Sequence, residues 1–173
     1  MKKNRQIVLD TETTGLSPEN GDRIVEIGCI ELINFVPTSK TFQQYINPDR
    51  KMSEGAFRVS GISDSFLSDK PKFEEIYEDF LKFIDDSPIV AHNAQFDVPW
   101  LITSLMRHQL DVPFKEVLCT LKWAKKKEEG KRSLGALSKK YNIGHENAHR
   151  ALADAVVTKS LYYIYDKEDF DYV

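Results

Sequence analysis

Two carboxylates stand two residues apart at the end of the first apolar run of the sequence. Asp10 and Glu12 follow Ile7–Leu9, a short run that is typical of a strand buried on both faces. In an extended chain, side chains two residues apart point to the same side of the sheet, so these charges repel each other and are costly to desolvate. A divalent cation removes that cost. The alternative interpretation is that polar residues simply end a strand.

Two further carboxylates are predicted on helices. Asp97 lies three and four residues before Trp100 and Leu101, which mark the core side of its helix, although an Asp near a helix N-terminus is also common as a favourable partner of the helix dipole. Asp154 heads an apolar stripe at spacings of three and four residues, and the stripe consists of Val157, Leu161 and Ile164. Asp154 therefore belongs to a buried face, where it needs a metal ion or a salt bridge to Lys or Arg.

A histidine precedes the last of these carboxylates. His149 lies five residues before Asp154, which is not the same face of a helix, so we expect it in the loop that leads into that helix. From there it can reach over the site as a general base, because an imidazole accepts a proton near neutral pH. The alternative is a surface histidine in a polar loop, with His145 beside it.

Length and composition bound the class of protein. A chain of 173 residues with 41% hydrophobic residues suits one domain, residues 1–173, with 166–173 as a short acidic tail. The net charge of −3 argues against a strongly basic nucleic-acid surface, but not against an enzyme whose metal ions neutralise phosphates. No apolar run approaches the ~20 residues of a membrane span, and residues 1–4 predict no signal peptide. With Cys29 and Cys119 in apolar runs, we expect a reduced, cytoplasmic protein.

The hydrophobic pattern predicts which elements position these residues. Strands are expected at 7–12, 23–32, 41–46, 88–91 and 116–119, with a turn at 36–39 and Gly28 allowing close backbone approach. Helices are expected from Pro71 to Ile84, from close to Asp97, over 133–141 and over 151–165, with short helical turns in 51–67. Strands first, followed by helices that alternate with strands, indicate an α/β domain with a mixed sheet.

Six segments together carry a family resemblance. The chain is similar to the DEDDh 3′→5′ exonucleases of the ribonuclease-H-like superfamily, and within them to the epsilon-type proofreading subunits of bacterial DNA polymerase III. The segments are IVLDTETTGL (7–16), RIVEIGCIE (23–31), AFRVSGISDSFL (56–67), HNAQFDVPWL (92–101), SLGALSKKY (133–141) and HRALADA (149–155). One departure is Ser60, where the epsilon-like loop commonly has His. A second is that the chain ends soon after its last predicted helix, without the polymerase-binding tail of epsilon.

The resemblance implies a fold and a mechanism. It implies a central five-stranded mixed sheet flanked by helices, with the first strand in the middle. It also implies two divalent ions, Mg²⁺ or Mn²⁺, held by four carboxylates, which are Asp10, Glu12, Asp97 and Asp154. His149 would take the proton from the attacking water, so all five residues count as catalytic. The implied substrate is a single-stranded or frayed DNA 3′ end, which releases nucleoside 5′-monophosphates, and a replicative DNA polymerase is an implied partner.

Substrate contacts are expected around the turn after the first strand. Thr13 and Thr14 offer hydroxyls and amides, and Leu16 could wedge against the terminal base. His92 and Phe96 are further candidates, with helix capping and core packing as their alternatives. Upstream phosphates could meet a basic cluster, unless it is only a solvated loop; the cluster consists of Lys122, Lys125, Lys126, Lys127, Lys131 and Arg132.

Three functions therefore compete. The first is a DNA 3′→5′ exonuclease in proofreading or repair. The second is a DEDDh exoribonuclease that trims RNA or short oligonucleotides, which the contact to the terminal 2′-hydroxyl would distinguish. The third is a non-catalytic interaction domain of the same fold, which the presence of all five chemical residues disfavours.

Overall fold

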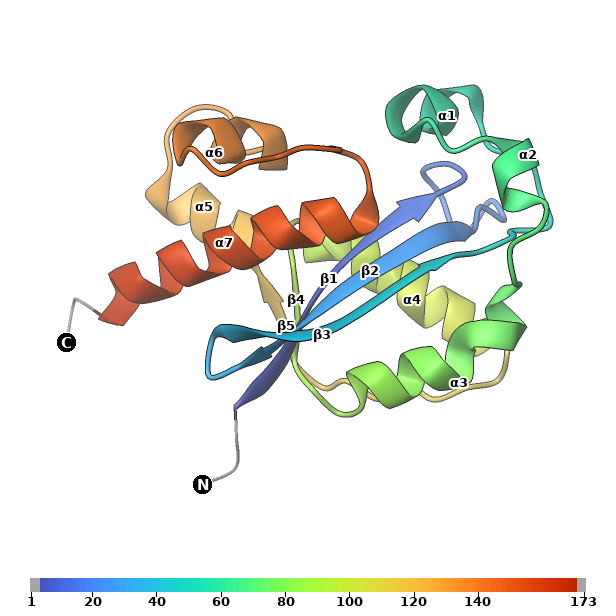
Figure 1. Ribbon diagram of the computed structural model, residues 1–173, viewed down its shortest axis with the longest axis horizontal. Coiled ribbons are helices and arrows are strands. Elements are labelled where there is room, and N and C mark those ends of the chain that lie inside the picture. The colour runs from blue at the N-terminus through green and yellow to red at the C-terminus, as the bar shows by residue number, and fades with distance from the viewer. Residues whose placement is uncertain (1–3, 171–173) are drawn as a thin grey trace.

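Five strands form one mixed sheet with β1 in the middle. The computed structural model describes the backbone of residues 4–170 and the side chains of residues 4–166, and it orders the strands β3-β2-β1-β4-β5 (Figure 1). The β1–β2 and β2–β3 pairs are antiparallel, whereas the β1–β4 and β4–β5 pairs are parallel. The strands are β1 (Arg5–Thr13), β2 (Ile24–Ile33), β3 (Val36–Tyr45), β4 (Ile89–Ala91) and β5 (Val117–Cys119). The predicted α/β class, the five-stranded mixed sheet and the central first strand are confirmed.

Helices cover both faces of this sheet. On one face lie α3 and α4, and on the other lies α7, with α5 and α6 packed beside it (Figure 1). The helices are α1 (Glu54–Ser60), α2 (Asp64–Leu67), α3 (Phe73–Ile84), α4 (Ala94–Arg107), α5 (Thr120–Lys127), α6 (Leu134–Lys140) and α7 (Ala151–Phe170). Over the residues described, none of them combines the length and the apolar character that crossing a membrane requires.

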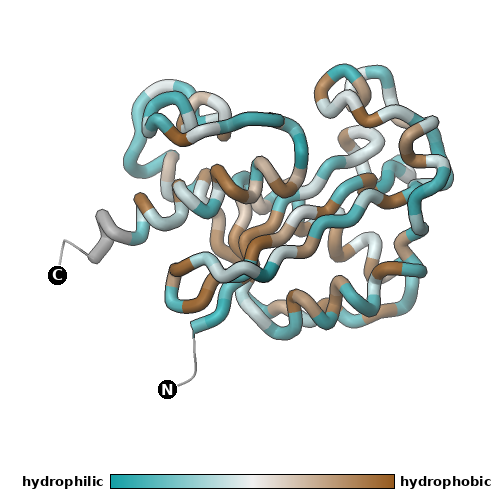
Figure 2. Tube along the Cα trace, viewed as in Figure 1, coloured by the Kyte–Doolittle hydropathy of each residue, from teal (hydrophilic) through white to brown (hydrophobic). Residues whose placement is uncertain are grey.

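The period-two pattern of β1 divides the core between the two faces. Ile7 and Leu9 pack with α3 and α4, whereas Val8 packs with Ala155 and Tyr162 of α7. Apolar segments accordingly follow the sheet and the inner sides of the helices, and polar segments lie outside them (Figure 2). The alternation carries beyond the apolar run, so that Asp10 and Glu12 point to the α7 side and Thr11 to the α4 side.

Gly28 allows α7 to approach the sheet, as its place in the second strand predicts. A Cβ at this position would lie 2.3 Å from the Leu152 backbone nitrogen and 2.4 Å from the Ala151 carbonyl carbon. Because Gly28 pairs with Asp10 across the β1–β2 ladder, the first turn of α7 is held directly over the carboxylates of β1.

Two predicted boundaries are wrong in informative ways. The expected turn at 36–39 is the start of β3, and the reversal occurs at Asn34 and Phe35, which both adopt positive φ. Pro37 is tolerated there because β3 is an edge strand. Helix α4 begins at Ala94 rather than close to Asp97, because Asn93 turns the chain sharply at a φ of +67°.

Two other segments are helical where the sequence predicted a loop or a tail. Residues 120–127, which hold much of the basic cluster, form helix α5 and not a loop. Helix α7 continues to Phe170, so 166–170 belong to the helix and not to the expected tail. Residues 1–3 and 171–173, including the end of that tail, lie outside the described residues. Both cysteines are buried and free, as expected.

Candidate active site

A cleft of about 440 Å³ opens where β1 leaves the sheet. Its walls come from β1 and the turn after it, from α1, from the start of α4 and from the first turn of α7. The four predicted carboxylates all line it, and they are Asp10, Glu12, Asp97 and Asp154. The structure therefore brings together residues that lie up to 144 positions apart in the sequence (10 to 154).

Asp97 connects α4 to β1. It sits in the first turn of α4 and is 2% exposed. Its Oδ1 accepts hydrogen bonds from the backbone N–H of Thr11, at 3.0 Å, and from the Thr11 hydroxyl, at 2.7 Å. These bonds fix the carboxylate against the central strand, so its position serves the cleft as well as the helix terminus.

Asp154 is buried in the first turn of α7, as its stripe predicts, and it is 7% exposed. The alternative to a metal ion, a salt bridge to Lys or Arg, is not seen among the described side chains. Asp154 forms a hydrogen bond with His145, whose Nε2 lies 2.5 Å from Asp154 Oδ1. The same oxygen also accepts a hydrogen bond of 3.3 Å from the His149 backbone N–H.

His149 occupies the loop before α7, where the sequence places it. Its φ is +64°, and its side chain is exposed. Ligand atoms of Glu12, His149 and Asp154 lie within 4.8 Å of one another. The imidazole therefore stands at the outer edge of the carboxylate cluster, within reach of a small molecule bound there.

Burial and like charge dominate the electrostatics of the cleft. Burial, followed by the neighbouring carboxylates of Asp154 and Glu26, raises the pKa of Glu12 to about 8. Burial also raises the pKa of Asp97 to about 7, against the lowering effect of its hydrogen bonds from Thr11. The pKa of Asp10 is raised well above its ordinary value, first by burial and then by Asp97 and Asp154. The cluster therefore attracts protons or cations.

Sequence reasoning missed two residues beside this cluster. Glu26, fully buried in β2, accepts a 3.1 Å hydrogen bond from the Ala151 backbone N–H and so anchors the start of α7. A signal for it existed, because Glu26 interrupts an otherwise apolar run two residues before Gly28 and on the same face. His145 was noted only as a neighbour of His149, and no spacing rule places it on Asp154.

The turn after β1 brings some of the predicted substrate contacts to the cleft. Thr13 and Leu16 line it, and Leu16 is 87% exposed, so it has no role in the core. Thr14 is not among the lining residues. Its hydroxyl donates to Asp22 Oδ1 at 2.9 Å, and its amide donates to the Arg23 carbonyl, so its polar groups serve the β1–β2 loop.

His92 and Phe96 also line the cleft, in positions that limit what they can offer. Both ring nitrogens of His92 are engaged, Nδ1 with the Thr120 hydroxyl at 2.9 Å and Nε2 with the Arg132 carbonyl at 3.0 Å. Burial lowers the pKa of His92. Phe96 packs on Trp100, with 5.8 Å between ring centroids. Each residue can present a ring face to a substrate, and that role stays a prediction.

The basic cluster lies on α5 and in the loop after it. Lys122, Lys125 and Lys126 are exposed, whereas Arg132 donates to the Glu128 carbonyl and is partly buried. Lys127 donates to the Tyr165 carbonyl of α7 at 3.0 Å. A nucleic-acid role for this cluster stays a prediction.

Comparison with known proteins identifies the family. The family model described as Exonuclease (RNase_T) matches residues 7–162. The chain belongs to this exonuclease family. The epsilon subunit of DNA polymerase III from Rickettsia prowazekii is 45% identical to this exonuclease over 169 residues, covering 94% of this chain and 74% of that protein. The subunit of the same name from Salmonella typhimurium is 40% identical, covering 91% of this chain and 70% of that protein.

Solved structures agree with the family. Exonuclease X in complex with 5′ overhanging duplex DNA superposes with a TM-score of 0.73 at 29% identity, covering 94% of this exonuclease and 92% of that chain. A structure of exonuclease I reaches a TM-score of 0.83 at 23% identity, covering 98% of this chain and 43% of that chain, and it supports the fold.

The donor set of the cleft fits divalent cations, on which exonucleases of this family generally depend. Carboxylate oxygens are the ligands that hard cations prefer, and burial together with the Asp154 carboxylate raises the pKa of both Glu12 and Asp97. Arg150 lowers the pKa of Glu12, but less than burial and the carboxylates raise it.

The raised pKa of Glu12 predicts how the metal-free exonuclease responds to pH. Between the ordinary value of 4.5 and about 8, the folded state holds a proton on Glu12 that the unfolded state has released. The free energy of unfolding therefore falls as pH rises through this window. Glu12→Gln removes this loss. The free energy of unfolding of Glu12→Gln minus that of the wild type should therefore increase by on the order of 2–4 kcal/mol from pH 4.5 to pH 8.

Thermal unfolding in a chelator, at several pH values, measures this difference. Glu129→Gln is a matched control because Glu129 is exposed and lies outside the cleft, and its difference from the wild type should not depend on pH. Added Mg²⁺ or Mn²⁺ should stabilise the wild type more at pH 8 than at pH 5. A pH-independent difference between Glu12→Gln and the wild type would contradict the electrostatic description of the cleft.

Proposed function

We propose that this exonuclease removes nucleotides one at a time from the 3′ end of DNA, in proofreading or repair. The convergence of four carboxylates on one cleft, in a chain of the exonuclease family, is the observation that carries the proposal. Relatives that are 40–45% identical bear the name of the epsilon subunit of DNA polymerase III, which supports proofreading. The DNA bound to exonuclease X, at 29% identity, supports DNA as the substrate.

The residues of the cleft divide the chemical work. Asp10, Glu12 and Asp154 would hold one Mg²⁺ or Mn²⁺ ion, and Asp97 would hold a second together with Asp10. Such ions, when bound, lower the pKa of water and neutralise charge that develops on the phosphate. His149 takes the proton of the attacking water from the solvent side. The oxygen of the attacking water bonds to phosphorus while the bond from phosphorus to the 3′ oxygen of the penultimate nucleotide breaks. That 3′ oxygen takes up a proton from solvent, and a nucleoside 5′-monophosphate leaves.

Leu16 supplies a test of how the terminal base is held. Because an apolar side chain can pack against any base, Leu16→Ala should raise KM for single-stranded DNA about three- to tenfold, with a smaller effect on kcat. The melting temperature should stay within a degree or two, because Leu16 is 87% exposed. Steady-state kinetics and thermal unfolding measure both quantities. Val36→Ala, at an exposed valine of β3, is the control, and an unchanged KM would exclude the wedge.

One assay tests the proposed function. The purified protein is mixed with 5′-labelled single-stranded DNA or RNA of the same sequence, with Mg²⁺, Mn²⁺ or a chelator. Stepwise shortening of DNA from the 3′ end that the chelator abolishes is the expected result. Preferential shortening of RNA would keep the mechanism but assign the protein to RNA trimming. No shortening of either strand would favour the non-catalytic alternative.

The relatives also suggest a protein partner. Their name places them in DNA polymerase III, so a replicative DNA polymerase is the partner that we propose for proofreading. Co-purification of this chain with a polymerase catalytic subunit tests the association, and separate elution of the two proteins at micromolar concentration would exclude a stable complex. The expected cytoplasmic location stays a prediction.

A further inference from the structure

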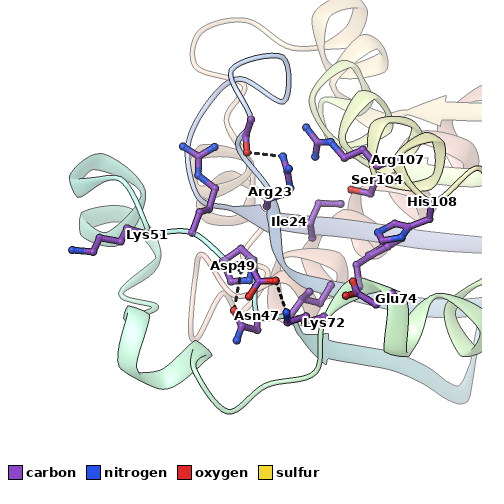
Figure 3. A pocket seen from close by; sticks show the side chains of 15 residues that line it. Arg23, Ile24, Asn47, Asp49, Lys51, Lys72, Glu74, Ser104, Arg107 and His108 are labelled. Carbon is purple, nitrogen blue, oxygen red and sulfur yellow. Dashed lines mark hydrogen bonds and ion pairs between the residues drawn. The ribbon is translucent and has the colours of Figure 1, made fainter.

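A second depression, larger than the active-site cleft, lies beside the loop between β1 and β2. Its volume is about 740 Å³, and its lining contains five Lys or Arg side chains, which are Arg23, Arg50, Lys51, Lys72 and Arg107. They come from four separate parts of the chain: the residue before β2, the segment between β3 and α1, the residue before α3, and the end of α4. We call this depression the arginine pocket (Figure 3).

Convergence of positive charge is unexpected in this protein. The chain as a whole carries a net charge of −3, and a run of lysines on one helix would be an ordinary solvated surface. Here the cations meet around a partly apolar floor that includes Ile24, Ile46 and Phe73, all of them buried. Two carboxylates, Asp49 and Glu74, are part of the same lining.

Ion pairs account for only some of these cations. Lys72 Nζ lies 2.6 Å from Asp49 Oδ2, and Arg50 Nη2 lies 3.3 Å from Asp22 Oδ1. Within the part of the chain whose side chains are described, Arg23, Lys51 and Arg107 form no ion pair. Figure 3 shows Arg23 and Arg107 at one end of the pocket, away from the pair of Lys72 and Asp49.

Backbone carbonyls hold the two unpaired arginines in place. Arg107 Nη2 donates to the Pro18 carbonyl at 2.8 Å, and its Nη1 donates to the Asp22 carbonyl at 3.4 Å. Arg23 Nη1 donates to the Gly21 carbonyl at 2.6 Å. A guanidinium has five N–H donors, so each group retains donors for an anion after these bonds. Desolvation, together with the nearby charges of Arg23 and Arg50, lowers the pKa of Arg107, as expected for cations that repel one another.

The arginine pocket and the active-site cleft share two segments of chain. The β1–β2 loop contributes Gly15 and Leu16 to the cleft, and Gly21 and Arg23 to the arginine pocket. The segment before α1 contributes Ser53 to the cleft, and residues 49–51 to the arginine pocket. The Ser53 backbone N–H donates to the Thr14 carbonyl at 2.8 Å and joins the two segments. A DNA chain that leaves the cleft across this wall therefore meets the unpaired arginines.

We propose that the arginine pocket binds backbone phosphates of DNA whose 3′ end lies in the cleft. This inference rests on the proposed function, and it adds a second binding site to it. Phosphodiesters suit the pocket because they carry one negative charge per nucleotide, which an arginine fork contacts without reading the base. The site thus raises the affinity for DNA independently of sequence.

Salt dependence of DNA binding tests the site. Each lost phosphate contact lowers the slope of log K against log salt by about 0.7 for single-stranded DNA. We expect Arg107→Gln to lower the slope by about 0.7 and Lys51→Gln/Arg107→Gln to lower it by about 1.4, with a three- to tenfold weaker affinity per contact at low salt. Fluorescence anisotropy of a labelled 16-nucleotide DNA, with a chelator present to prevent cleavage, measures both quantities.

The controls separate phosphate binding from loop support. Lys82→Gln removes one charge at an exposed position of α3 outside both depressions, and its slope should equal that of the wild type. Arg107→Lys should recover most of the slope, because the charge returns although the paired bonds to Pro18 and Asp22 are lost. Loss of affinity in Arg107→Lys equal to that in Arg107→Gln would assign Arg107 to loop structure and overturn the proposal.

Two further measurements identify the ligand and distinguish a failure of the phosphate-binding proposal from a failure of the proposed exonuclease function. The ratio of kcat/KM for DNA to kcat/KM for a thymidine 5′-monophosphate nitrophenyl ester should fall in the double variant, because the ester is too short to reach the arginine pocket. Inorganic pyrophosphate could instead stabilise the wild type but not Arg107→Gln, while the salt slopes for DNA binding are the same in both proteins. This result would assign the pocket to a free anion and not to DNA. Wild-type protein that cleaves neither substrate would refute the proposed exonuclease and leave the slopes as a separate result.

Discussion

Asp10→Ala should abolish the metal-dependent release of mononucleotides from DNA. We expect kcat to fall by at least about 10³-fold, because the variant loses one of the two carboxylates that the central strand β1 contributes to the cleft. In the wild type, the pKa of Asp10 is raised by burial and by the charges of both Asp97 and Asp154, so Asp10 interacts with the carboxylates on the other elements of the cleft. Removing it weakens cation binding and leaves the developing charge on the phosphate uncompensated.

The loss must be separated from unfolding. Asp10→Ala removes a half-buried carboxylate that is costly to ionise, so the metal-free variant should be at least as stable as the wild type at pH 8. Thermal unfolding in a chelator measures this, and calorimetric titration with Mn²⁺ should show weaker binding than in the wild type. Asp79→Ala, at an exposed position of α3, is the matched control and should keep normal rates. Normal mononucleotide release by Asp10→Ala would refute the assignment of the active site.

Local patterns determine what could be predicted from sequence. The apolar run of Ile7–Leu9 and the carboxylates after it are contiguous, so the central strand and the common face of Asp10 and Glu12 follow from a period of two. The helical stripe below Asp154 likewise predicts its burial. Gly28 was predicted to allow close approach, and the first turn of α7 does lie against it.

Partners chosen by tertiary structure could not be predicted. Nothing in the spacing of nine residues between His145 and Asp154 indicates that they pair, because a loop with positive φ at Asn147 and His149 separates them. The hairpin at Asn34 and Phe35 was missed because this turn contains no glycine and therefore lacks the preferred Asn-Gly pair.

The arginine pocket illustrates the same limit on a larger scale. Arg23 and Arg107 are 84 residues apart (23 to 107), and neither belongs to a charged run in the sequence. The run that does attract attention, on α5, partly serves the structure, because Lys127 donates to the carbonyl of Tyr165. Charge density along the chain is therefore a poor guide to charge density on the surface of this protein.

Replacement of His149 is the second change with a large expected effect. His149→Asn should lower kcat by about 10²- to 10⁴-fold near neutral pH, the range typical of a lost general base. Asn is the suitable replacement because it tolerates the left-handed backbone that His149 adopts, with a φ of +64°. The side chain is exposed and lies at the edge of the carboxylate cluster, so the melting temperature and the affinity for DNA should change little.

Two readouts distinguish proton transfer from a structural role of His149. The deficit of His149→Asn should shrink as pH rises, because hydroxide replaces the attacking water and needs no base, and added imidazole should restore part of the rate. His145→Asn provides the comparison, since His145 contacts Asp154 directly at 2.5 Å and orients a carboxylate instead of facing solvent. The His145→Asn variant should bind Mn²⁺ more weakly, and added imidazole should not restore its rate. If His145→Asn lost more activity than His149→Asn and recovered it with imidazole, the base would be His145 and not His149.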